Sequence, residues 1–94
     1  MTANVREFAA ITVHAWMNAY GSGFYYVPWN RFGTFDEARR DGWIRAHHTD
    51  DFLVGEFEGD RLVTLFSGNR LRSEWKPEDF VAVAQAIDAT YREL

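Results

Sequence analysis

The chain has 94 residues, a formal net charge of −4 and no cysteine; 47% of its residues are hydrophobic and 17% are aromatic. This length suits one domain with one hydrophobic core, and the absence of cysteine excludes disulfides and thiolate metal sites. No apolar run approaches the roughly 18 residues that cross a bilayer, and the N-terminus lacks the basic start of a secretion signal, so we expect one cytoplasmic domain over residues 1–94.

The first element that the sequence predicts is a helix over residues 5–20. Apolar residues recur there at spacings of three and four, the helical period: Val5, Phe8, Ala9, Thr12, Val13, Trp16, Ala19 and Tyr20. Asn4 and Glu7 have the spacing of a capping box, and residues 21–23 (Gly-Ser-Gly) end the segment.

An edge strand and a short helix are expected next. Residues 24–29 combine aromatic and β-branched side chains with Pro28, which cannot donate to the ladder of a central strand. Thr34 and Glu37 form a second capping box, which predicts a helix that runs to about Asp41 with Gly42 as its left-handed terminator.

Three strands and a last helix complete the prediction. Residues 43–48 alternate weakly, and residues 52–57 and 61–66 flank a Gly-containing loop, which indicates a hairpin. Residues 70–75 fit either a strand or a loop. Pro77 is typical of a first helical turn, and an apolar stripe follows it: Phe80, Val83, Ala84, Ile87 and Tyr91.

The expected fold is therefore α+β in the order α-β-α-β-β-β-α. It has a mainly antiparallel sheet of three to four short strands, two longer helices at the N- and C-terminal ends on one face of that sheet, and one short helix.

Candidates for chemistry are few, and we predict no enzyme, no cofactor and no metal. His47 and His48 are followed closely by Asp50 and Asp51, but on a strand the two imidazoles would point to opposite faces and could not share a metal. A polar turn explains this run better. The small arginine clusters at residues 39–45 and 70–72 do not offset the acidic balance, so no direct nucleic-acid binding is expected.

Charge and aromatic content indicate a protein partner instead. Residues 48–94 hold ten acids against five Lys or Arg, which favours basic partner surfaces. Six rings lie within residues 24–35, and rings that a small core cannot hold are typical of interface hot spots; a ring-rich core is the alternative. The candidate protein-binding residues are Tyr25, Tyr26, Trp29, Arg31, Phe32, Asp50, Asp51, Glu56, Glu58 and Asp60.

The leading hypothesis is a non-enzymatic protein-binding module, an accessory or inhibitor protein of a bacterium or phage. Nine Arg to one Lys fits a GC-rich genome, and the small size and acidic charge are similar to those of anti-defence proteins such as anti-CRISPRs, which block nucleic-acid-handling complexes. Two alternatives stay open. One is a small-ligand binder or enzyme that uses an aromatic pocket (Tyr25, Trp29, Trp43) with His47 or His48, and the other is a structural homodimer.

Overall fold

The structure, a computed structural model, describes residues 5–46, 52–68 and 77–91. Within these ranges five strands and two helices follow one another: β1 (Arg6–Asn18), β2 (Gly21–Phe32), α1 (Phe35–Arg45), β3 (Phe52–Glu58), β4 (Arg61–Ser67), α2 (Pro77–Ala86) and β5 (Thr90–Tyr91). The strands form one curled sheet in the order β2-β1-β3-β4-β5, antiparallel except between β4 and β5. Neither helix in these ranges has the length and apolar character that crossing a membrane requires.

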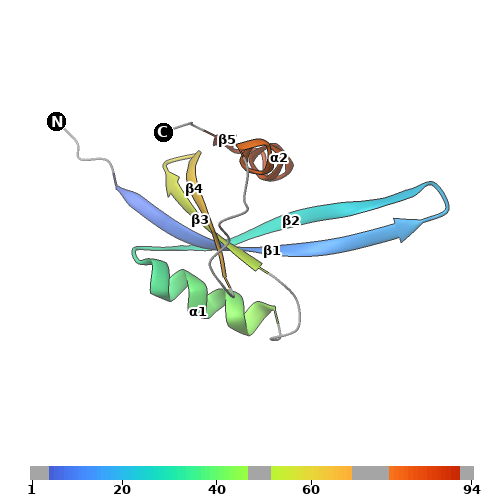
Figure 1. The fold of residues 1–94 in the computed structure, drawn as a ribbon. Helices are drawn as coiled ribbons and strands as arrows, with labels where there is room; N and C mark the ends of the chain where they lie inside the picture. Colours follow the sequence, from blue (N-terminus) through green and yellow to red (C-terminus); the bar gives the residue numbers. More distant parts are fainter. Residues whose placement is uncertain (1–4, 47–51, 69–76, 92–94) are drawn as a thin grey trace.

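The β1–β2 hairpin projects well beyond the other elements (Figure 1). It turns at Ala19 and Tyr20, where the Asn18 side-chain oxygen accepts a hydrogen bond of 2.8 Å from the Tyr20 amide. In the described chain β3 accompanies β1 only as far as Thr12, so the hairpin beyond this point consists of two strands alone. We call residues 13–26 the arm.

The predicted N-terminal helix over residues 5–20 is wrong, because these residues form β1 and the turn after it. The inner half of β1 is covered on both faces, and such strands read as continuous apolar runs in which a helical spacing arises by chance. Ala9 and Ala10, which favour a helix, serve here as small residues on opposite faces of a central strand, and both are fully buried.

The two helices lie on opposite faces of the sheet (Figure 1). The predicted pair of N- and C-terminal helices on one face is wrong, because its N-terminal member is strand β1. The α2 side buries one cluster: Ala9, Ile11, Leu53, Phe57, Leu62, Leu65, Val83 and Ala84. The α1 side buries the other: Ala10, Ala38, Ala46, Phe52 and Val54, with Phe8, Phe32, Phe35, Trp43 and Phe66 packed around them. Neighbouring residues of β1 and β3 alternate between the two clusters because strand side chains alternate between faces.

The short helix is longer than predicted. Thr34 is its N-cap, and its hydroxyl accepts from the Glu37 amide at 3.3 Å and donates to the Glu37 carboxylate at 2.8 Å. Gly42 lies inside the helix instead of ending it, so the predicted strand over residues 43–48 is wrong where the structure describes it. Gly42 is glycine for another reason: a Cβ there would overlap the ring of Phe52.

The second half of the chain is closer to expectation. The predicted hairpin is present as β3 and β4, with Gly59 in the left-handed conformation at its turn. Helix α2 begins at Pro77 and ends at Ala86. Asp88 then adopts the left-handed conformation, and the chain continues into β5. Tyr91 therefore lies on a strand, stacked on Phe80 at 5.3 Å between ring centroids. Residues 70–75 lie outside the described ranges.

The expected order α-β-α-β-β-β-α, with three to four short strands, is thus replaced by β-β-α-β-β-α-β in a mixed, five-stranded sheet. Each of the two misplaced segments has its own physical reason. Burial on two faces hides the period of two in β1, and close packing requires a glycine where the sequence indicated a helix end.

Replacing Gly42 by alanine is expected to destabilise the protein, although alanine favours an exposed helix over glycine by roughly 1 kcal/mol. The added Cβ must displace the buried Phe52 ring, so we expect the free energy of unfolding to fall by about 1–3 kcal/mol. Gly33→Ala is the matched control, because a Cβ there meets no atom within 4 Å. Urea unfolding measures both, and a Gly42→Ala variant as stable as the wild type would contradict this packing.

Candidate functional site

A chain of side-chain contacts links the last turn of α1 to the base of the arm. The Asp41 carboxylate accepts a hydrogen bond of 2.9 Å from the Arg45 guanidinium, whose central carbon lies 4.0 Å from the centre of the Trp29 ring system. The Trp29 indole N–H donates to the hydroxyl of Thr12 at 2.9 Å. The cation–π contact between Arg45 and Trp29 therefore joins helix to sheet, while one hydrogen bond within α1 and one between β2 and β1 hold its two partners in place.

The same contacts continue along the arm. The Thr12 hydroxyl lies 2.8 Å from the ring nitrogen Nε2 of His14, and the His14 ring stacks on Tyr25 with 4.8 Å between centroids. We call these six residues the aromatic row: Asp41, Arg45, Trp29, Thr12, His14 and Tyr25.

Strand register brings the aromatic row together. Thr12 and His14 are two residues apart on β1 and so share its α1 side, and the ladder places Tyr25 directly opposite His14. The register shifts between Ala9 and Ile11, in the stretch that faces Trp29. Asp41 and Arg45 are one helical turn apart on α1.

Trp16 extends this face of the sheet toward the tip of the arm. It is opposite Gly23, and a Cβ on Gly23 would lie 2.9 Å from the indole nitrogen of Trp16. The indole thus lies against the bare backbone of β2, a close approach that only glycine allows at this position.

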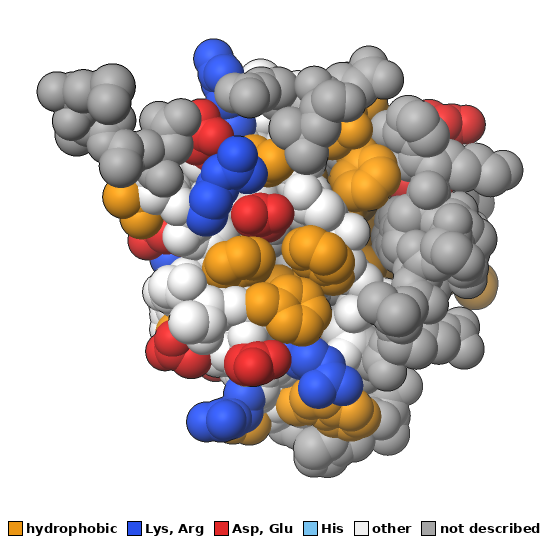
Figure 2. Space-filling model, turned by 60° about the vertical axis from the view of Figure 1, so that its left-hand side comes forward, with side chains coloured by type: hydrophobic (Ala, Val, Ile, Leu, Met, Phe, Trp, Pro, Cys, Tyr) orange, Lys and Arg blue, Asp and Glu red, His pale blue; other side chains and the backbone are white. Residues whose placement is uncertain are grey.

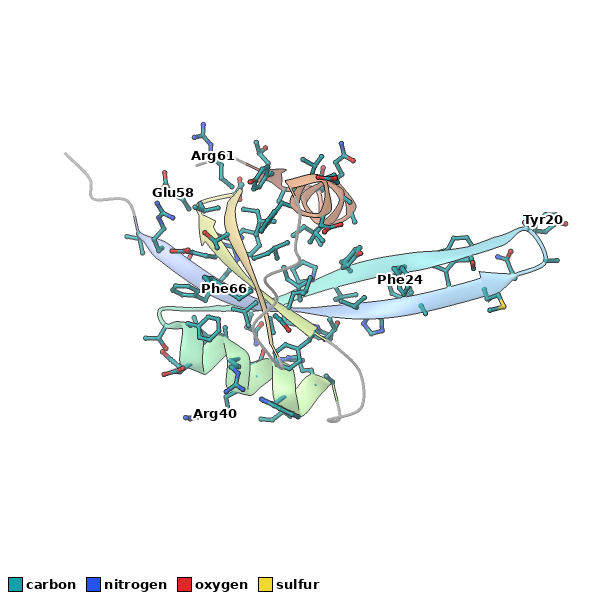
Figure 3. All side chains as sticks on the ribbon, viewed as in Figure 1. Tyr20, Phe24, Arg40, Glu58, Arg61 and Phe66 are labelled. Atoms are coloured by element: carbon teal, nitrogen blue, oxygen red, sulfur yellow. The ribbon has the colours of Figure 1, made fainter. Side chains whose placement is uncertain are left out.

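The arm is exposed and carries no charged group. On the α1 side, Trp16 and Tyr25 of the arm and Trp29 at its base are 43%, 50% and 37% exposed. Met17 and Phe24 are exposed on the other side, and Tyr20 is exposed at the tip; Figure 3 labels Phe24 and Tyr20. The sequence has no Asp, Glu, Lys or Arg between Glu7 and Arg31. Figure 2, in which the side away from the arm comes forward, shows basic and acidic side chains interspersed among hydrophobic ones.

The hydroxyl–imidazole pair of Thr12 and His14 has the spacing of a nucleophile and its base, but its surroundings suit structure and not catalysis. Thr12 is only 4% exposed, and its hydroxyl already accepts from Trp29. A catalytic pair also needs a group that orients the imidazole, and in the described ranges no carboxylate hydrogen-bonds to His14. The Thr12 hydroxyl instead holds two rings in fixed positions.

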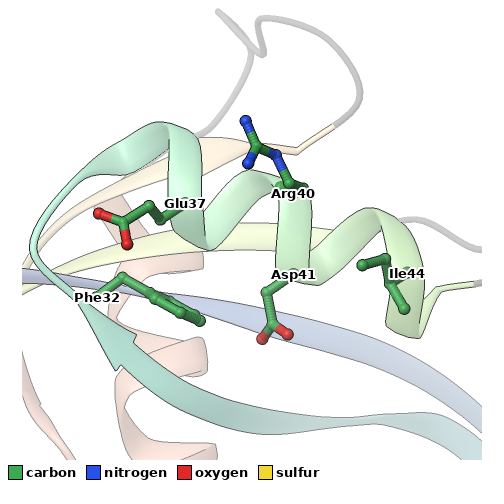
Figure 4. A pocket seen from close by; sticks show the side chains of 5 residues that line it. All are labelled: Phe32, Glu37, Arg40, Asp41 and Ile44. Carbon is green, nitrogen blue, oxygen red and sulfur yellow. The ribbon is translucent and has the colours of Figure 1, made fainter.

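A hollow of about 250 Å³ lies between the end of β2 and α1 (Figure 4). Its lining includes Phe32, Glu37 and Asp41, and both carboxylates are engaged, one by Thr34 and the other by Arg45. No group of three metal-ligating side chains gathers anywhere in the described residues. Arg40 and Ile44 complete the lining, so the Arg40 guanidinium is the charged group that this hollow offers to a ligand.

The predicted aromatic site residues divide between this surface and the core. Tyr25 and Trp29 belong to the aromatic row. Tyr26 is half-buried against the α2-side cluster, and Phe32 against the α1-side cluster. Arg31 lies 3.9 Å above the Phe57 ring and donates to the Gly59 carbonyl at 3.1 Å, so its cation is held at the sheet.

The predicted acidic residues lie elsewhere. Glu56 and Glu58 both pair with Arg6, at 3.5 Å and 3.2 Å, which offsets part of their charge. Asp60 lines a hollow of about 300 Å³ near β5. Asp50 and Asp51, with His47 and His48, fall outside the described residues. Trp43, from the alternative ligand pocket, packs edge-to-face on Phe52 in the α1-side cluster.

Sequence reasoning did not find Thr12, Trp16 or Arg45 as parts of this surface. Thr12 and Trp29 are 17 residues apart, and only the register of the β1–β2 hairpin brings them together. The usable signal was the uncharged stretch from residue 8 to residue 30, interrupted by turn-forming Asn18 and Gly21.

Comparison with protein-family models, with curated proteins and with solved structures finds no match to this chain. The geometry of the arm and the aromatic row is therefore what indicates a function for this chain.

Thr12→Val should lower the free energy of unfolding by about 1–2 kcal/mol, because the isosteric methyl group neither accepts from Trp29 nor bonds to His14. Thr12→Ser keeps the hydroxyl, so its free energy of unfolding is expected to fall by less. Urea unfolding followed by tryptophan fluorescence measures both variants. A Thr12→Val variant as stable as the wild type, with the loss confined to Thr12→Ser, would show that packing of the Thr12 methyl group, and not the hydroxyl, holds the row.

Proposed function

We propose that this protein is a protein-binding module whose contact surface is the arm together with the aromatic row at its base. The observation that carries the proposal is a projecting hairpin (Figure 3). It exposes Trp16, Tyr25 and Trp29 on a stretch of 23 residues without a formal charge. Isolated exposed apolar residues are ordinary, but a contiguous exposed group of large rings is typical of interaction sites.

The chemistry of the row supports an interface. Trp, Tyr and Arg are the residue types most enriched among interface hot spots, and Trp29, Tyr25 and Arg45 lie in one connected set of contacts. Each is already fixed by a neighbour, so binding would cost little further side-chain entropy. Such a preorganised surface suits a partner with an apolar, weakly charged groove or face.

The acidic form of the hypothesis, in which carboxylates occupy a basic groove, has weaker support. Arg6 sits between Glu56 and Glu58, which reduces the negative field that they would present. An inhibitory or anti-defence role in a bacterium or phage stays a prediction from size and charge.

The two forms differ in their response to salt. An aromatic interface without net charge, in which Asp41 and Arg45 pair with each other, should retain its partner between about 0.05 M and about 0.5 M salt. A carboxylate-mediated contact should weaken steeply over that range. Affinity capture from bacterial lysate at both salt concentrations, with the immobilised wild-type protein, gives the comparison.

Trp16→Ala and Tyr25→Ala should each reduce the captured partner by about tenfold or more, the loss of one hot-spot contact. Val81→Ala is the matched control, since Val81 is 40% exposed on α2 and belongs to neither the arm nor the aromatic row. Circular dichroism checks that all variants fold. The proposal would be refuted if Trp16→Ala and Tyr25→Ala still captured the partner and high salt released it. That result would favour the hypothesis in which carboxylates occupy a basic groove.

A further inference from the structure

We infer that two copies of this chain join through the outer edge of β2, forming one continuous sheet about a two-fold axis at Phe24. This goes beyond the proposed function, because it uses backbone groups at the strand edge and leaves the aromatic row free. The occupant of the edge is a second copy of the same chain.

The edge of β2 is open where sheet edges are normally protected. Among the described residues β2 is the outermost strand, and β5 at the opposite edge is described over Thr90–Tyr91. Proteins protect long edges with charged side chains, prolines or bulges. Both protective features of this hairpin, Pro28 and the register shift near Ala9, lie at its base, while residues 21–27 carry neither feature and no charge.

The register shows which backbone groups face outward. Asn18 and Gly21 close a two-residue loop, so they form a hydrogen-bonded pair, and every second pair after them repeats this arrangement. Gly21, Gly23 and Tyr25 therefore direct their backbone groups to β1. Ser22, Phe24 and Tyr26 direct theirs outward. By the same alternation Pro28 faces outward. This position suits proline, because an edge strand needs no N–H donor on its solvent side.

A two-fold pairing centred on Phe24 uses these outward groups. Phe24 of one copy would pair with Phe24 of the second copy, and Ser22 of each copy would pair with Tyr26 of the other. Such antiparallel pairs exchange two hydrogen bonds each, about six in all. The Phe24 rings, 65% exposed in one copy, would meet across the axis as an aromatic pair. Tyr20, 98% exposed at the tip, would lie beside Pro28 of the second copy.

Charge favours self-pairing at this edge. A two-fold axis places each residue near its own copy, so a charged edge would repel itself. Each chain carries a net charge of −4, yet residues 8–30 carry none. The uncharged stretch coincides with the open strand edge, which lets two acidic chains approach there without like-charge contacts.

The pairing has a consequence for partner binding. An axis perpendicular to the sheet leaves both copies of the aromatic row on the same side of the joined sheet. A partner with two equivalent sites would then bind both rows, with an avidity above that of one row.

Sedimentation equilibrium of the wild-type chain over a range of concentrations tests the inference, with a reversible monomer–dimer equilibrium expected. Phe24→Pro should raise the dimer dissociation constant about 100-fold, because it removes an outward donor from both copies while the bonds to β1 remain. Phe24→Ala keeps the donor and should weaken the dimer less.

Phe24→Lys is a second variant that needs no change in backbone conformation. It places like charges at the axis and should dissociate the dimer most strongly at low salt. Met17→Lys is its matched control, because Met17 lies on the same face of the arm but on the inner strand and is 84% exposed.

A wild-type chain that stays monomeric up to about 1 mM, a concentration at which even a weak complex forms, would overturn the inference. So would a folded Phe24→Pro variant that dimerises like the wild type. The row variant Tyr25→Ala is expected to keep the dimer, so a failure of partner capture and a failure of dimerisation are distinguishable.

Discussion

The position of the Phe52 ring holds the two halves of this structure together. The ring is fully buried at the start of β3, in space that Gly42 of α1 and Gly68 after β4 leave empty. The Gly68 amide also donates to the Phe52 carbonyl at 2.8 Å, which fixes the end of β4 on the same residue. Because α1 is fixed there, its last turn places Arg45 over Trp29. The geometry of the aromatic row thus depends on a packing contact that contains none of its residues.

The strand β1 connects this core to the arm, and its two halves have opposite surroundings. Ala9, Ala10 and Ile11 are buried between two helices, whereas Trp16 and Met17 are exposed on a hairpin that has no third strand in the described chain. An isolated two-stranded hairpin is at best marginally stable in water. The His14–Tyr25 stack and the indole of Trp16 on Gly23 are cross-strand contacts that support it. The rings that stabilise the arm are therefore also the rings that it exposes.

Local signals in the sequence predicted local structure well. The Thr34–Glu37 capping box, the hairpin around Gly59 and the start of α2 at Pro77 each depend on a few adjacent residues, and each is present. The same reasoning failed at β1, where burial on both faces removed the alternation that marks a strand. It also failed at Gly42, whose role depends on Phe52, a residue ten positions away and on another element. Within the candidate site, sequence composition indicated Tyr25 and Trp29, but Thr12, Trp16 and Arg45 required the cross-strand register.

The missing charges explain why one segment can offer two separate contact surfaces. Exposed hairpins usually carry lysines or glutamates that keep their edges from pairing, and residues 8–30 have neither. This leaves the side chains of the α1 face and the backbone of the β2 edge both accessible, and these point in perpendicular directions because strand side chains stand out of the sheet while its hydrogen bonds lie within it. A partner on the row would not compete with a second copy on the edge.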